Sequence, residues 1–226
     1  MSDLKVYEII SLDGPSGAGK STVAKLVAKK LGYKYLDTGA MYRAVTLFFL
    51  NKNVNIQNDN EIISAISDLK ISFDNNNKIY LNDVDVSEEI RSIEVVNMVS
   101  KVSSISAVRK SMVSLQRAIA ENDNYVVDGR DIGSVVFPLA KYKFYIDASV
   151  EIRAKRRYEE EIQKGKDITF EEVIDSIKKR DEFDSNREDS PLVVPKDAII
   201  IDTTNMTIDE VVQKITDVVF NKKSNE

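Results

Sequence analysis

The pattern of apolar and polar residues predicts two kinds of strand in this chain. Mainly apolar runs, typical of strands that are covered on both faces, occur at residues 5–12, 33–36, 125–127, 143–146 and 198–201. Helical spacing appears between them, first over residues 20–31, where Gly32 supplies the stop. The other helices are expected at residues 39–50, 59–69, 93–103 and 107–121. Apolar strands that alternate with helices predict an α/β domain with a parallel five-stranded core sheet.

A different pattern occupies residues 70–87. KISFD, KIYLN and DVDVS alternate apolar and polar residues, and Asn/Asp-rich turns separate them. This is typical of a small antiparallel meander with one wet face, which we interpret as an insert at about 64–105. Thr169 with Glu172 and Thr207 with Glu210 form capping boxes and mark two late helix starts. We expect one domain over residues 1–226, with a flap at about 151–170.

Composition narrows the chemistry. The 226 residues are 42% hydrophobic and 31% charged, with a formal net charge of −5 and neither histidine nor cysteine. A Ser-His-Asp triad, a thiolate nucleophile and a cysteine-based zinc site are therefore excluded. The acidic balance argues against a general nucleic-acid binder. With no apolar run of membrane-spanning length and no signal-peptide pattern at the start, we expect a cytoplasmic protein without a membrane partner.

The stretch "SLDGPSGAGKST" carries a phosphate-binding motif. Gly14, Gly19, Lys20 and Ser21 match G-x-x-x-x-G-K-[ST], with a predicted strand before the loop and a helix after it. Such a loop turns backbone N–H groups toward phosphate oxygens, while the lysine reaches the β- and γ-phosphates and the Ser21 hydroxyl ligates Mg²⁺. The expected ATP contacts are Gly14, Pro15, Ser16, Gly17, Ala18, Gly19, Lys20, Ser21 and Thr22. The loop alone does not choose among ATPases, GTPase switches, helicases and small-molecule kinases.

Scarce arginines gather in three later segments, "LDTGAMYR", "VVDGRDIGSVVFP" and "IKKRDEFDSNREDSPL". The first two follow predicted strands, at the edge where open α/β sheets bind ligands. The third places an arginine, an aspartate and an arginine at i, i+4 and i+7, on one helical face. The alternative is an ordinary set of surface ion pairs, which is our interpretation for Arg91 and Arg117. The candidates are Asp37, Thr38, Arg43, Asp128, Arg130, Asp131, Arg180, Asp184 and Arg187.

Another arginine group lies in "SVEIRAKRRYEEEIQKGKD", a predicted helix that leads into a polar loop with a glycine. Taken alone, Arg153, Arg156 and Arg157 describe a solvated helix. Beside a phosphate-binding loop, they indicate a flap whose arginines close over the phosphate in transfer.

Taken together, these motifs resemble those of the bacterial cytidylate kinases, within the nucleoside monophosphate kinases. The resemblance covers essentially the whole chain and is carried by "DGPSGAGKST", "DTGAMYR", "DGRDIG" and "RDEFDSNREDSPL", in that order. It implies the three-layer fold of P-loop kinases, a nucleotide-binding insert and a lid. It also implies transfer of the ATP γ-phosphate to CMP or dCMP with Mg²⁺ as the cofactor.

The resemblance further implies roles for single residues. Arg43, Arg130 and Arg187 would hold the CMP phosphate, Arg180 and Asp184 the ribose, and Ser100, Arg109 and Asp131 the cytosine edge, with Thr38 as a further CMP contact. The expected catalytic residues are Lys20, Arg130, Arg153, Arg157 and Asp128. Asp128 is expected beside the Mg²⁺ site without touching the metal.

Several readings stay open at this point. The acceptor could be UMP, AMP or a small metabolite such as shikimate, although the second and third segments argue against shikimate. A nucleotide-binding regulator without turnover needs the loop but neither the arginine groups nor the flap. We expect a monomer, because no segment reads as an exposed apolar patch.

Overall fold

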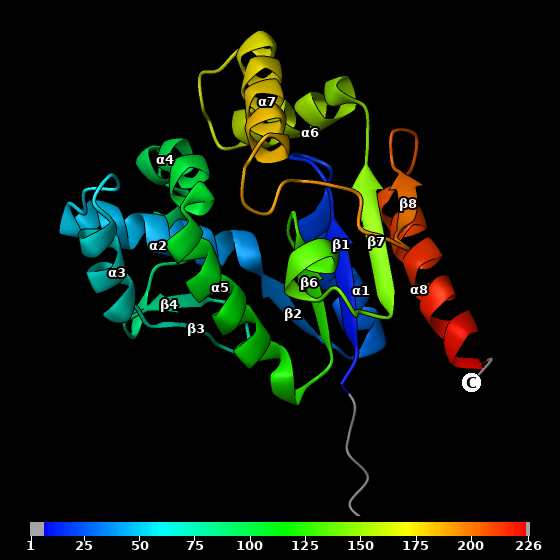
Figure 1. Cartoon of the computed structure of the whole chain (residues 1–226). Coiled ribbons are helices and arrows are strands. Elements are labelled where there is room, and N and C mark those ends of the chain that lie inside the picture. Colours follow the sequence, from blue (N-terminus) through cyan, green and yellow to red (C-terminus); the bar gives the residue numbers. More distant parts are fainter. Residues whose placement is uncertain (1–6, 225–226) are drawn as a thin grey trace, which may run out of the picture. The chain divides into compact units, whose positions relative to one another are not determined.

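A five-stranded sheet forms the centre of the fold in a computed structural model of the chain, which describes residues 7–224 (Figure 1). Its order is β2-β6-β1-β7-β8. The strands are β1 (Ile9–Asp13), β2 (Lys34–Asp37), β6 (Tyr125–Asp128), β7 (Tyr142–Asp147) and β8 (Ile199–Asp202). β1 pairs in parallel with both β6 and β7, and β7 pairs in parallel with β8. The predicted parallel core sheet is confirmed.

Two compact units make up the chain, and each is described by itself. The first contains the residues up to Tyr35 together with those from Ala120 onward, and the second is Leu36–Ile119. In the first unit the central strands are buried on both faces, with Ile10, Leu12, Val126 and Phe144 fully buried. Helices α1 (Lys20–Leu31) and α8 (Ile208–Ser224) pack against each other and join this core. Burial on both faces explains why these strands are mainly apolar runs.

Helix ends in the first unit follow the local signals. Gly32 adopts the left-handed conformation with φ 70°, and its N–H closes α1 on the carbonyls of Ala28 and Lys29. Thr169 and Glu172 form the predicted capping box at α7 (Phe170–Ser185). Thr207 and Glu210 exchange the same bonds before α8.

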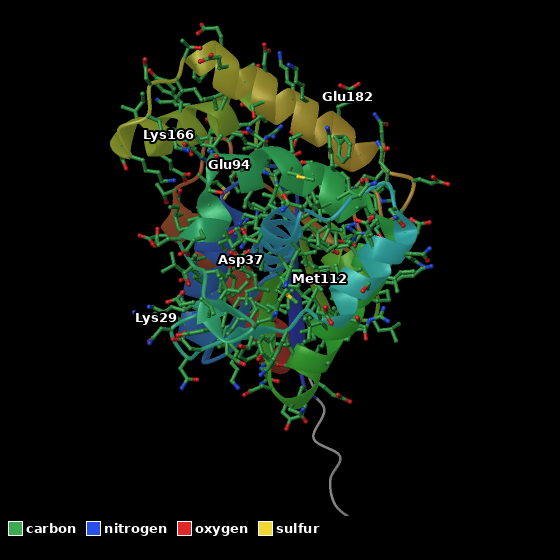
Figure 2. All side chains as sticks on the ribbon, turned by 90° about the vertical axis from the view of Figure 1, so that its left-hand side faces the viewer. Lys29, Asp37, Glu94, Met112, Lys166 and Glu182 are labelled. Carbon is green, nitrogen blue, oxygen red and sulfur yellow. The ribbon has the colours of Figure 1, made fainter. Side chains whose placement is uncertain are left out.

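Helices α6 (Val150–Gln163) and α7 lie side by side (Figure 1). Ala154, Val173 and Ile177 form their small buried core, and the rings of Tyr158 and Phe170 meet edge to face at 5.9 Å. The opposite sides of these helices are polar, and Glu182 points outward (Figure 2). Two short helical turns complete the unit, η2 (Ala120–Asn122) and η3 (Ile132–Val136).

In the second unit, four helices accompany the predicted meander. The helices are α2 (Thr38–Lys52), α3 (Asp59–Ser67), α4 (Ile93–Ser104) and α5 (Ser106–Ile119), with the turn η1 (Glu89–Arg91) before α4. The meander consists of β3 (Ile71–Phe73), β4 (Ile79–Leu81) and β5 (Val84–Asp85), paired antiparallel. Helix α2 packs against α4, and α5 buries Met112, which lies inside the unit (Figure 2). The alternating pattern thus gave the right pairing for this small sheet.

Two expected boundaries differ from the structure. The first strand begins at Ile9, where its pairing with Tyr125 begins, and Lys5 and Val6 of the expected strand lie outside the described residues. Helix α7 ends at Ser185, so the expectation that Arg187 lies on its face is wrong. The Asp184 carbonyl, in the last turn, instead accepts hydrogen bonds from the Leu192 N–H and from Nε of Arg187. Carbonyls at helix ends lack partners within the helix, and here the following chain supplies them.

Candidate active site

The phosphate-binding loop lies between β1 and α1, as predicted. Gly14, Gly17 and Gly19 have φ values of 145°, 76° and 82°, which residues with side chains rarely adopt. At Gly14 a Cβ would also collide with the Ile146 carbonyl oxygen, so the loop leaves β1 in direct contact with β7. These constraints explain the glycines of the motif and fix the start of the loop against the sheet.

Lys20 is folded back into this loop. Its side chain is buried, and Nζ donates a 2.6 Å hydrogen bond to the Pro15 carbonyl. Burial, and then the positive charge of Arg130, hold the pKa of Lys20 below its ordinary value. Negative charge bound beside this ammonium group would offset both effects.

Ser21 and Asp128 meet at the start of α1. The Ser21 hydroxyl donates to the Asp128 carboxylate at 2.8 Å, and the Tyr35 hydroxyl donates to its other oxygen at 2.7 Å. A hydroxyl and a buried carboxylate in contact are hard oxygen donors of the kind that Mg²⁺ prefers. The Ser21 hydroxyl therefore fits the predicted metal position, and Asp128 holds this hydroxyl from beside it.

A cluster of guanidinium groups surrounds Asp184. Its carboxylate accepts from Nε of Arg130 at 3.0 Å and lies 3.9 Å from Nη1 of Arg187. Burial alone would raise the pKa of Asp184, but Arg130, Arg180 and Arg187 together hold it below its ordinary value. Arg130 and Arg180 also act on Lys20 electrostatically, so the structure brings these first-unit candidates together beside the phosphate-binding loop.

The loop after β6 holds Asp131, which is 4% exposed. The Asp131 carbonyl accepts from the N–H groups of both Val135 and Val136, which begins the π-helical turn η3. Turns of this kind are rare and concentrate at functional sites. On the other side, the N–H groups of Ile132 and Gly133 donate to the carboxylate of Asp13, each at 2.7 Å.

The flap arginines differ sharply from one another. Arg153 is buried and donates to the carbonyls of Ala148 and Ser16 and to the carboxylate of Asp181, which also accepts from the Ser16 N–H. Arg156 binds Thr203. Arg157, two-fifths exposed, pairs with Glu160 and Glu161 on its own helix. Of these three arginines, Arg153 is the one that donates a hydrogen bond to the phosphate-binding loop within residues 7–224.

In the second unit, Asp37 and Arg43 bracket the start of α2. Asp37 caps the helix by accepting the Ala40 N–H at 2.7 Å, and its other oxygen lies 3.4 Å from Nη2 of Arg43. Thr38, the first residue of α2, is 3% exposed. A Cβ on Gly39 would lie 3.2 Å from the Arg43 guanidinium, so glycine makes room for that side chain.

Arg109 is the most deeply buried arginine of the second unit, at 2% exposure. Its guanidinium lies over the Tyr42 ring at 5.4 Å, and Nη1 donates to the Ser103 carbonyl at 3.0 Å. The Ser103 hydroxyl in turn donates to the carbonyl of Ser100. Thus Ser100 and Arg109, on two helices, belong to one hydrogen-bonded corner.

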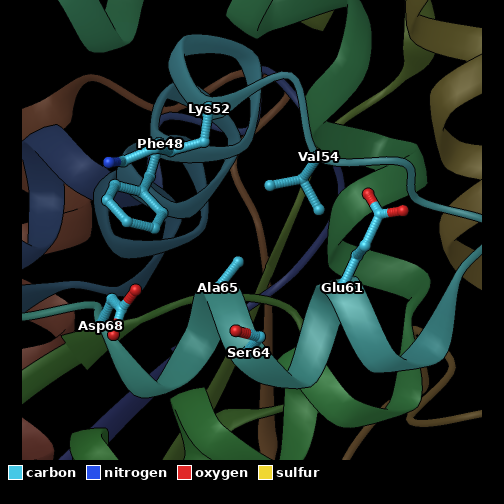
Figure 3. Close-up of a pocket in the computed structure, with 7 residues that line it drawn as sticks. All are labelled: Phe48, Lys52, Val54, Glu61, Ser64, Ala65 and Asp68. Atoms are coloured by element: carbon cyan, nitrogen blue, oxygen red, sulfur yellow. The ribbon is translucent and has the colours of Figure 1, made fainter.

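A separate hollow in the second unit lies between the end of α2 and α3 (Figure 3). Its lining residues are Phe48, Lys52, Val54, Glu61, Ser64, Ala65 and Asp68. None of the candidate site residues lines it. In the part of the chain that the structure describes, no three His, Cys, Asp or Glu side chains form a metal-binding group, and no helix is both long and apolar enough to span a membrane.

Comparison with known proteins decides the family. Residues 10–221 match the family model described as cytidylate kinase. The chain is 53% identical to the cytidylate kinase of Clostridioides difficile strain 630, covering 92% of this chain and 95% of the relative. It is 50% identical to the cytidylate kinase of Fusobacterium nucleatum, again covering 92% of this chain and 95% of the relative. The chain belongs to the cytidylate kinase family.

Solved structures agree on the fold. An uncharacterized protein from Eubacterium ventriosum superposes with a TM-score of 0.53 at 13% identity, covering 96% of this chain and 99% of that one. Shikimate kinase from Acinetobacter baumannii, in complex with shikimate, gives a TM-score of 0.50 at 16% identity, with 96% of each chain covered. At such identities the likeness shows the kinase fold alone and says nothing of the acceptor.

The sequence pattern assigned no role to Asp13, Tyr35 or Asp181. Asp13 is the first residue of "DGPSGAGKST" and Asp181 is the second residue of "RDEFDSNREDSPL", so both lie inside the quoted motifs. Their partners are far away in the sequence, at Ile132, Gly133, Ser16 and Arg153. Periodicity and spacing carry no signal for such long-range bonds.

Proposed function

We propose that this chain transfers the γ-phosphate of ATP to CMP or dCMP, giving ADP and CDP or dCDP. Membership of the cytidylate kinase family over nearly the whole chain supports the acceptor. The observation that carries the reaction class is the group of cations beside the phosphate-binding loop, Lys20, Arg130 and Arg180, with Arg187 on the shared carboxylate of Asp184. Transfer between two anions needs such charge to offset their repulsion.

On the donor side, the backbone of Gly14–Thr22 binds the ATP phosphates, and Lys20 reaches the β- and γ-phosphates. Ser21 holds Mg²⁺, and Asp128 fixes the Ser21 hydroxyl from outside the metal's own ligands. When bound, Mg²⁺ would supply positive charge against the negative charge that develops on the phosphates.

On the acceptor side, the residues named by the family motifs contact CMP. Arg43, Arg130 and Arg187 bind its phosphate, Arg180 and Asp184 its ribose, and Ser100, Arg109 and Asp131 its base, with Thr38 donating a further hydrogen bond. The pairs seen in the structure, Arg130–Asp184 and Arg43–Asp37, hold two of these guanidinium groups in place by charge-assisted bonds.

The chemistry is an in-line displacement. A phosphate oxygen of CMP forms a bond to the γ-phosphorus while the bond from that phosphorus to the β,γ-bridging oxygen breaks, and ADP leaves. The transition state is loose, so positioning and charge stabilisation matter more than a strong base. A protein without histidine or cysteine can therefore catalyse it.

The proposal also covers the lid, the oligomeric state and the location of the enzyme. Segment 151–170 acts as the lid, with Arg153 and Arg157 stabilising the phosphate in transfer, and the insert at about 64–105 serves the acceptor. The enzyme works as a monomer in the cytoplasm.

A coupled assay of ADP release tests the function. ADP release should depend on added CMP or dCMP and on Mg²⁺, with UMP far less efficient and AMP or GMP negligible. An ADP release rate that does not change when CMP is added would favour a nucleotide-binding regulator. A kcat/KM for UMP or AMP comparable to that for CMP would indicate a kinase with another acceptor.

A further inference from the structure

The carboxylate of Asp13 is completely buried at the end of β1, one residue before the phosphate-binding loop. Its two oxygens accept the N–H groups of consecutive residues, Ile132 to Oδ1 and Gly133 to Oδ2. This is the arrangement in which a single carboxylate fixes the direction of a backbone turn. A buried carboxylate has a high desolvation cost, so the fold keeps it only with such partners.

Gly133 makes the approach possible. A Cβ at this position would lie 2.8 Å from Oγ of Ser11, 3.1 Å from Oδ2 of Asp13 and 3.1 Å from Cβ of Pro195. A side chain at this position would therefore press first on Ser11 and then on the Asp13 carboxylate and Pro195. The close approach to these three residues explains the glycine of "DGRDIG" that follows Ile132.

The turn that Asp13 fixes begins directly after Arg130 and Asp131. The Asp131 carbonyl is held from the other side by Val135 and Val136, so the backbone of Asp131 lies between two sets of hydrogen bonds. Two further points anchor the loop, since the Gly129 N–H donates to the Leu12 carbonyl on β1 and Arg130 is paired with Asp184. The end of β1 therefore controls where both Arg130 and Asp131 stand.

We propose that Asp13 is a positioning residue for the acceptor, which sets the Arg130–Asp131 turn for CMP although it belongs to the strand that leads into the ATP loop. This inference rests on the proposed function, in which Arg130 and Asp131 contact CMP. Asp13 touches neither substrate and acts only through the turn. A residue that directly precedes the phosphate-binding loop would thus position the side chains that contact the acceptor.

The test compares Asp13→Asn and Gly133→Ala with Asp147→Asn, a control at the carboxyl end of the neighbouring strand β7. Asparagine keeps the volume of Asp13 but offers one acceptor oxygen for two N–H donors, and alanine at 133 pushes the turn from the carboxylate. Both variants should raise the KM for CMP by roughly tenfold to hundredfold while the Kd of MgATP, measured without CMP, stays within about twofold. Asp147→Asn should behave as the unmodified enzyme.

Hydrogen exchange of segment 129–136 supplies a readout that does not depend on activity. Both variants should lose protection there and keep it in segment 14–22. Equal weakening of ATP and CMP binding, an unchanged KM for CMP, or unfolding of both variants would overturn the positioning role. If the unmodified enzyme released no ADP with CMP, the proposed function would fail instead, while the exchange data would still report whether Asp13 holds the turn.

Discussion

The cations of the first unit and Arg109 of the second are held in different ways. Around the phosphate-binding loop, guanidinium groups share carboxylates, as in Arg130 with Asp184 and Arg153 with Asp181. The contacts of Arg109 include the ring of Tyr42 and a backbone carbonyl, neither of which carries a formal charge. A cluster of paired charges attracts any polyphosphate, whereas one fixed, buried donor discriminates between flat ring edges. In the proposed function, the first region serves the reaction and the second serves the choice of base.

Lys20→Ala should have the largest effect, because it removes a buried ammonium group from the region that serves the reaction. Loss of such a preorganised donor costs about 100- to 1,000-fold in kcat. Lys29→Ala is the matched control, since Lys29 is exposed on the same helix (Figure 2). Steady-state kinetics with saturating CMP measures both, and near-normal kcat in Lys20→Ala would remove the loop lysine from the mechanism.

Arg109→Met should lower kcat/KM for CMP by roughly tenfold to hundredfold and narrow the gap to UMP. Uracil already mismatches the Arg109 donor, so the substitution should lower kcat/KM for UMP less than kcat/KM for CMP. Arg117→Met, on the exposed side of the same helix, should leave the ratio of CMP to UMP efficiency unchanged. Equal losses for both nucleotides would assign Arg109 to the packing of the second unit.

Asp184→Asn should raise the KM for CMP by about tenfold and change the KM for ATP little. It removes the negative charge that Arg130, Arg180 and Arg187 share, and with it the proposed ribose contact. The ratio of CMP to dCMP efficiency should change as well, since only CMP carries the 2′-hydroxyl. Asp175→Asn, exposed on α7, provides the control, and a parallel loss for ATP and CMP would mean that Asp184 serves the fold.

The smallest expected effect is the contribution of Asp13 to the pH dependence of the free energy of unfolding. Burial above all, and then the charge of Asp131, raise the pKa of Asp13 to about 7, against the lowering effects of the Gly133 and Ile132 N–H groups and of Lys20. The folded protein thus keeps a proton that the unfolded chain has released above its ordinary pKa of 3.8. This group therefore makes the free energy of unfolding fall as pH rises from about 4 to about 7, by at most about 1.4 kcal/mol per pH unit.

Urea denaturation across this pH range measures that slope. Asp13→Asn cannot titrate, so its free energy of unfolding should fall less steeply than that of the unmodified protein. Identical slopes for the two proteins would show that Asp13 does not change its charge on folding in this range.

Local patterns in the sequence predicted the sheet, the meander and the helix caps, because each depends on neighbouring residues. Gly32 ends α1 and Thr169 starts α7 as expected. The end of α7 was missed because the partners of the Asp184 carbonyl come from Arg187 and Leu192, beyond the helix.

The candidate site could be predicted as a set of residues, while the bonds among them could not. Arg153 and Arg157 stand one helical turn apart in one basic stretch, yet the first is tied to Ser16 and Asp181 and the second to acids on its own helix. Their difference arises from tertiary packing, which composition and spacing do not contain. For the same reason, the sequence did not predict the bonds that Asp13 accepts from Ile132 and Gly133.

Base selectivity tests the central claim most directly. Initial rates of ADP release, measured for the unmodified protein with CMP, dCMP, UMP and AMP as acceptors, give kcat/KM for each. A site in which Asp131 accepts from the cytosine amino group and Arg109 donates to the ring edge should favour CMP over UMP by about 10⁴-fold, with dCMP close to CMP. Similar kcat/KM values for CMP and UMP, or for CMP and AMP, would contradict the account.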